Sequence, residues 1–107
     1  MPLATAQDIT TLNSWGFRDS YNKNRNNFID VVRIVYRTLT EHTGRPPNNP
    51  GDIVNILATS LQSSNIFLRM VSRSPYMSPI LYPAIASAMA RYILDDAWHT
   101  IINDKEA

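Results

Sequence analysis

Apolar side chains recur at intervals of three and four residues in the segment that follows Asn27. This spacing places them on one face of an α-helix, while charged side chains fall on another face. The β-branched residues of this segment would also suit a strand, but its polar residues do not alternate with period two, so a helix is favoured. The pattern predicts an amphipathic helix of about four turns. Its apolar positions are Phe28, Val31, Val32, Val35 and Leu39.

Proline and glycine mark where helices begin and end along the chain. The run 44–51, GRPPNNPG, predicts a loop, and Asn49 followed by Pro50 is typical of a helix start. We therefore expect a helix to begin near residue 50. The polar triplet at 63–65 predicts a break in this helix and leaves open whether residues 66–72 form another short helix.

The two ends of the chain also have helical patterns. A short helix is expected near 8–15, with Thr5 or Thr10 as its cap, and a long final helix from about residue 83 to residue 103. No pair of strands is predicted. A chain of 107 residues is long enough for one hydrophobic core. We expect a single all-α domain over residues 1–107, folded as a compact bundle of four to five helices.

Composition excludes several classes of function. The chain has no cysteine, which removes disulfides, thiol nucleophiles and zinc–thiolate sites. Its three glycines cannot build a glycine-rich phosphate-binding loop in the usual way, and its few glutamates cannot supply a carboxylate metal centre. No stretch approaches the roughly 18 apolar residues of a membrane span, and no signal-peptide pattern is present. We therefore expect a soluble, cytoplasmic protein without a membrane contact, a cofactor or a metal.

The stretch 66–82 has the composition of a protein interface. Its sequence, IFLRMVSRSPYMSPILY, combines aromatic residues, methionines and arginines with prolines that limit the entropy lost on binding. The stretch could instead pack inside, beneath the last helix. A chain of this size would not easily bury it together with Trp15, Phe17, Tyr36 and Trp98. We therefore predict a non-enzymatic protein–protein interaction or oligomerisation module, most simply a homodimer. Its expected contact residues are Phe67, Met70, Tyr76, Met77 and Tyr82.

A basic segment supports an alternative function, that of a nucleic-acid-binding regulatory protein. Residues 18–45 contain six cations against three acids, and such cations could neutralise phosphates. Part of this charge is expected to be paired internally, because Asp30 precedes Arg33 by three residues and Glu41 follows Arg37 by four. The residues expected to bind nucleic acid in this alternative are Arg18, Lys23, Arg25, Arg33 and Arg37.

A third possibility is an enzyme, or a bundle that binds a small apolar ligand. His99 follows Asp96 by three residues and Asp95 by four, so one carboxylate could orient the imidazole as a general base. A histidine near the C-terminal end of a helix, one turn after acidic residues, is also favoured by the helix dipole and by ion pairing. We therefore prefer a non-catalytic role for this histidine. If the chain is an enzyme, His99 and Asp96 are the expected catalytic residues; otherwise none is expected.

Overall fold

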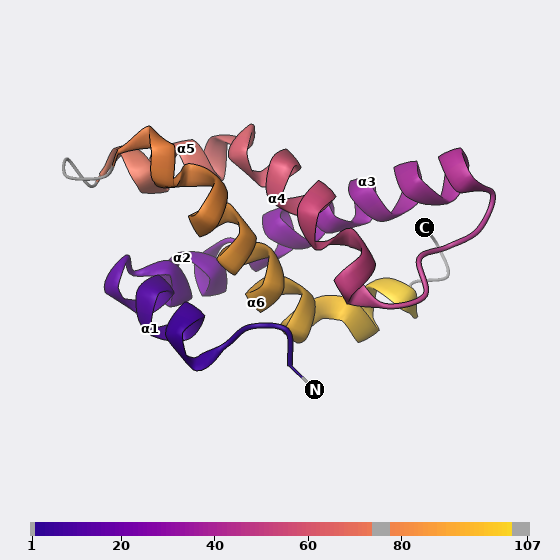
Figure 1. Ribbon diagram of the computed structural model, residues 1–107, viewed down its shortest axis with the longest axis horizontal. Coiled ribbons are helices and arrows are strands. Elements are labelled where there is room, and N and C mark those ends of the chain that lie inside the picture. The colour runs from indigo at the N-terminus through magenta and orange to yellow at the C-terminus, as the bar shows by residue number, and fades with distance from the viewer. Residues whose placement is uncertain (1, 74–77, 104–107) are drawn as a thin grey trace.

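Six α-helices and two short 3₁₀-helices make up the computed structural model, which describes residues 2–73 and 78–103 (Figure 1). No strand occurs in these residues, so the expected all-α bundle is confirmed. The α-helices number one more than the upper limit expected from the sequence. They and the 3₁₀-helices are α1 (Ala6–Ser14), α2 (Phe17–Lys23), α3 (Arg25–Thr43), η1 (Pro50–Ile53), α4 (Val54–Gln62), α5 (Asn65–Ser72), η2 (Pro79–Leu81) and α6 (Tyr82–Ile102).

The helix that the sequence did not predict is α2. Gly16 lies between α1 and α2 with a φ of +70°, a left-handed conformation that glycine adopts without strain. Phe17 and Tyr21 lie about one turn apart on α2 and are both buried. A helix of seven residues carries too few apolar positions for its period to be recognised. Asn24 then joins α2 to α3.

Polar side chains determine where α1 and α5 begin. Thr5 caps α1, because its Oγ1 accepts a hydrogen bond from the Asp8 amide while the Asp8 carboxylate accepts one from the Thr5 amide. Ser64 caps α5, because its hydroxyl oxygen accepts a hydrogen bond from the Phe67 amide at 3.2 Å. The break predicted at 63–65 is therefore present and is followed at once by a new helix.

The helix start at Asn49 differs from the predicted one. The Asn49 side chain makes no capping hydrogen bond, and the chain enters through the 3₁₀-helix η1, which has Pro50 in its first turn. The α-helix α4 begins only at Val54. Proline fits the start of η1 because it has no N–H group to leave without a partner.

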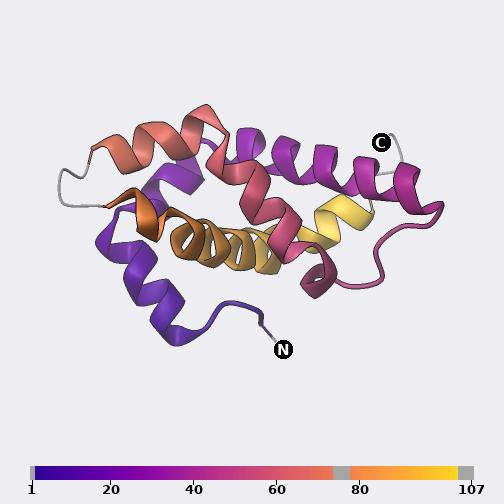
Figure 2. The same cartoon turned by 45° about the horizontal axis from the view of Figure 1, so that its top comes forward.

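The last helix, α6, runs through the middle of the molecule (Figures 1 and 2). It contacts α1, α3, α4 and both 3₁₀-helices, and among the described residues its contact with α4 is the most extensive between any two elements. Nine of its 21 residues are buried, and four of these nine are alanines. Small side chains let neighbouring helices approach closely. The other helices therefore pack around α6.

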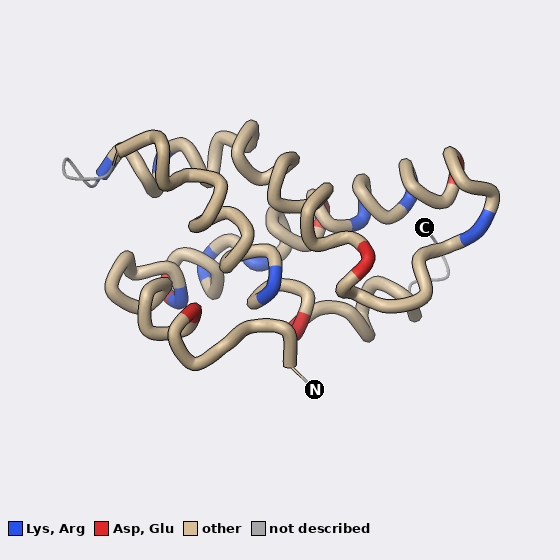
Figure 3. The backbone as a smooth tube through the Cα atoms, in the orientation of Figure 1, with Lys and Arg blue, Asp and Glu red and all other residues tan. Residues whose placement is uncertain are grey.

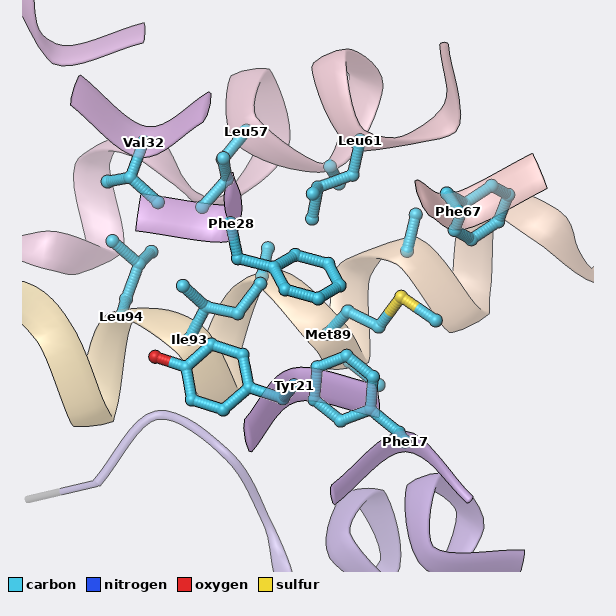
Figure 4. Packing of buried hydrophobic residues seen from close by; sticks show 14 of the residues in the cluster. Phe17, Tyr21, Phe28, Val32, Leu57, Leu61, Phe67, Met89, Ile93 and Leu94 are labelled. Carbon is cyan, nitrogen blue, oxygen red and sulfur yellow. The ribbon is translucent and has the colours of Figure 1, made fainter. Parts of the chain in front are cut away.

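Aromatic rings from α2, α3 and α6 meet in the core, and Figure 4 shows how Phe17, Tyr21 and Phe28 lie within it. The ring centroid of Phe17 lies 5.7 Å from that of Phe28 and 5.4 Å from that of Tyr92. Tyr21 stacks on Phe17 with the centroids 5.8 Å apart. Stacked and edge-to-face contacts at such distances are favourable for aromatic pairs. These rings hold α2 and α3 against α6.

The four aromatic residues outside the stretch 66–82 that were expected to compete for the core differ in their burial. Phe17 is fully buried, and Trp15, Tyr36 and Trp98 are half-buried against the core. Tyr36 and Trp98 pack edge to face with their centroids 5.9 Å apart. Only Phe17 of these four is therefore fully buried, and Leu68, Ile80 and Leu81 of the stretch 66–82 remain exposed.

Two acidic side chains tie the N-terminal segment to α6. Arg91 donates two hydrogen bonds to the Asp8 carboxylate, from Nε at 2.8 Å and from Nη2 at 3.0 Å. The Asp95 carboxylate accepts hydrogen bonds from the backbone amides of Leu3 and Ala4, at 2.8 and 2.9 Å. The hydrogen bond from Arg91 holds the pKa of Asp8 below its ordinary value.

Replacement of Leu57 by alanine tests the contact between α4 and α6. Leu57 is fully buried, and we expect Leu57→Ala to lower the free energy of unfolding by about 2–5 kcal/mol because it leaves a cavity. Ile56 is its neighbour on α4 and is 44% exposed, so Ile56→Ala is a matched control with a much smaller expected loss. Urea unfolding followed by circular dichroism measures both losses. Equal losses would contradict the observed orientation of α4.

The ion pair between Asp8 and Arg91 predicts a pH dependence of stability. Because the fold lowers the pKa of Asp8 below 3.8, the pair stabilises the folded state above about pH 4, and this contribution is lost as the pH falls through the folded pKa. We expect Asp8→Asn to lower the free energy of unfolding by about 2 kcal/mol at pH 7 and by much less at about pH 2.

The matched control for this pH experiment is Asp52→Asn. Asp52 is exposed and forms no ion pair with another described residue. Denaturant unfolding at several pH values compares the two variants with the wild type. A loss in Asp8→Asn that stays constant with pH would show that the ion pair is not its cause.

Candidate interaction surface

The described parts of the stretch 66–82 lie at one end of the molecule, where α5 meets the start of α6 (Figures 1 and 2). Phe67 of α5 and Tyr82 of α6 bring the two helices together, with their rings edge to face and their centroids 5.5 Å apart. The 3₁₀-helix η2 leads into α6 here, and the Ser78 hydroxyl oxygen accepts a hydrogen bond from the Ile80 amide at 3.4 Å. Two segments of the predicted interface are therefore neighbours in space.

The five predicted contact residues do not share one environment. Phe67 and Met70 are buried in the core, which is the alternative that the sequence left open for this stretch. They face inward because they share a helical face with the buried residue Val71. Tyr82 is half-buried against the core, and Tyr76 and Met77 lie outside the described residues. Of the described contact residues, Phe67 and Met70 therefore contribute little to the free surface of this region.

Three large apolar side chains at this end of the molecule are exposed. Leu68 is 45% exposed, Ile80 82% and Leu81 48%. Leu68 points away from the core because successive residues of a helix are turned by about 100° from one another, and its neighbour Phe67 points inward. The sequence could not single out these three, because α5 is apolar at several consecutive positions and η2 is too short to have a recognisable period.

Two of the five residues predicted to bind nucleic acid are engaged by carboxylates. The Nε of Arg25 lies 3.0 Å from Oδ2 of Asp96. The Nη1 of Arg33 lies 3.4 Å from Oδ1 of Asp30, which confirms the predicted pair. These contacts reduce the positive charge that the segment offers to phosphates.

The other three of these residues, Arg18, Lys23 and Arg37, are exposed. The ion pair expected between Arg37 and Glu41 does not form in the described structure. Figure 3 shows the cationic positions spread along the chain, with acidic positions between them. The cationic positions of segment 18–45 are therefore not gathered at one place on the backbone.

Asp96 joins α6 to two helices of the N-terminal half. The Tyr21 hydroxyl donates a hydrogen bond to Oδ2 of Asp96 at 2.6 Å, and the Nε of Arg25 donates to the same oxygen at 3.0 Å. Burial and the hydrogen bond to Asp96 raise the pKa of Tyr21, and the hydrogen bond to Asp96 raises the pKa of Arg25. No sequence pattern indicates this contact, because 75 residues separate Tyr21 from Asp96.

His99, the other residue of the enzyme hypothesis, is exposed on α6. Among the described residues, no hydrogen bond joins its ring to Asp95 or Asp96. Asp95 accepts from two backbone amides and Asp96 from two side chains, so both carboxylates are occupied in contacts that hold the fold together. Among the described residues, the imidazole therefore has no orienting carboxylate of the kind that a general base would use.

Two further properties concern metals and membranes. Within residues 2–73 and 78–103, no three histidine, aspartate or glutamate side chains come together in a way that could hold a metal ion. In the same part of the chain, no helix combines the length and the hydropathy needed to cross a membrane.

Comparison of the chain with family models, with curated proteins and with solved structures found no match. Its function is therefore inferred from the described side chains and their geometry.

Proposed function

We propose that this chain is a non-catalytic interaction module that forms a homodimer through an apolar end patch, defined as Leu68, Ile80 and Leu81. One observation carries the proposal: these residues are half of the six large apolar side chains that are exposed in the described structure, and they lie at one end of the molecule, on α5 and on η2, which leads into α6 where Tyr82 meets Phe67 of α5. Exposed apolar side chains that gather in one region are typical of a contact surface. The occupied carboxylates next to His99 support a binding role rather than a catalytic one.

The proposed occupant of the apolar end patch is a second copy of the chain. In a two-fold symmetric dimer each copy presents the same patch to the other, so an apolar surface can pack against itself. The formal net charge is only +1, so two copies can meet without strong repulsion. Leu68 is turned about 100° around α5 from its cationic neighbour Arg69. The helix can therefore present Leu68 to a partner without bringing the arginines of the two copies together.

Light scattering behind a sizing column tests the proposed dimer. The wild-type chain should have about twice the mass of the 12.1 kDa monomer. We expect the double variant Leu68→Asp, Ile80→Asp to have the mass of one chain, because a dimer would bury carboxylates without partners. Circular dichroism should show unchanged helix content, since both side chains are exposed.

Ile34→Asp is the matched control for this experiment. Ile34 is 63% exposed on α3, so the variant adds one aspartate, half the charge of the double variant, at an apolar position outside the patch, and it should leave the dimer intact. A wild-type mass of one chain at every concentration tested would contradict the proposal. Loss of the dimer in Ile34→Asp would also contradict it, since the contact would then lie elsewhere.

A further inference from the structure

A polar cleft of about 470 Å³ lies between α2 and α5, apart from the residues of the apolar end patch. Arg69 lines it from α5 and Arg73 from the C-cap of that helix, where the backbone is still in the α-helical region, so their spacing of four residues places them on the same side. Ser20 and Lys23 line it from α2 with a spacing of three residues. One side of each helix therefore contributes polar groups to the cleft.

The cleft carries positive charge that the chain does not neutralise. It is lined by Lys23, Arg69 and Arg73 and by one acid, Asp19, so three positive charges and one negative charge leave a formal charge of +2. All four side chains are exposed. None of the three cations has a carboxylate within 4 Å among the described residues, unlike Arg91. The cleft can therefore offer its charge to a ligand.

The arrangement of these cations favours a bound anion. Like charges four residues apart on a helix repel each other, and Arg69 and Arg73 have this spacing. Lys23 adds a third positive charge from the opposite helix. An anion held between the three side chains would replace part of this repulsion with attraction.

We propose that the cleft binds the phosphate group of a small phosphate monoester. Such a group carries about −1.5 to −2 charges near pH 7, which matches the cleft's formal charge of +2. Arginine binds phosphate oxygens through paired N–H donors, and the Ser20 hydroxyl supplies a further, neutral donor.

The rest of the lining suits the organic part of such a ligand. Ile66 and Met70 line the same cleft and provide an apolar contact beside the cations. A volume of about 470 Å³ falls within the range of roughly 300–1,000 Å³ that is usual for small-molecule sites. The cleft therefore favours an organic monoester over inorganic phosphate.

Phenyl phosphate is a suitable probe, added to the full chain while the backbone amide signals are followed by NMR. We expect shifts that concentrate on α2 and α5 and an affinity that falls as the salt concentration rises. Arg69→Gln should weaken binding about tenfold, because it removes a charge-assisted hydrogen-bond donor. Asp19→Asn should tighten binding, because it removes a negative charge beside the phosphate.

Arg37→Gln is the matched control, since Arg37 is an exposed arginine on α3 and has no carboxylate partner among the described residues. It should leave the affinity for phenyl phosphate unchanged. The proposal is overturned if phenyl phosphate shifts no amide of α2 or α5. It is also overturned if Arg37→Gln weakens binding as much as Arg69→Gln does, because the effect is then one of general charge.

A single-stranded oligonucleotide distinguishes the small ligand from a nucleic acid. We expect it to bind no more tightly than phenyl phosphate, because the cleft holds one phosphate group. Much tighter binding that both Arg37→Gln and Arg69→Gln weaken would overturn the proposal. Phosphate contacts would then extend over several helices, as in nucleic-acid recognition.

Discussion

The packing of α6 against its neighbours is the contact on which the rest of the structure depends. Its buried alanines lie beside larger residues such as Met89 and Ile93, so neighbouring helices can come close without losing apolar contact. α1, α3, α4 and both 3₁₀-helices all touch α6. A change that separates α4 from α6 would therefore disturb most of the core at once.

Charged side chains on α6 complete this packing. Arg91 holds α1 through Asp8, Asp95 holds the segment before α1, and Asp96 holds α2 and α3 through Tyr21 and Arg25. The contacts of Arg91 with Asp8 and of Tyr21 with Asp96 are partly buried, which strengthens them, whereas the other contacts are exposed. The acidic end of the helix, which suggested a catalytic pair with His99, instead fixes the N-terminal helices in place.

The helix α5 presents three different sides. Phe67 and Met70 belong to its buried side, Leu68 is exposed, and Arg69 faces the cleft with α2 together with Arg73 at the C-cap. The proposed dimer contact and the proposed phosphate site use different side chains of this helix. One chain can therefore engage a second copy and a small anion without competition for the same residues.

The sequence by itself determined the all-α class, the long helices α3 and α6, and the break before α5, because apolar spacing and capping residues act locally. Tertiary contacts decided the rest. The seven residues of α2 include two buried aromatic side chains, Phe17 and Tyr21. They are buried because Phe28 and Tyr92, from other helices, pack against them. The apolar run in α5 allows more than one inward face, and only packing against α6 turned Phe67 inward and left Leu68 exposed. Asp96 contacts residues that are distant from it in the sequence, and the cations that line the cleft come from two helices that are also far apart in the sequence. No local sequence pattern could reveal either arrangement.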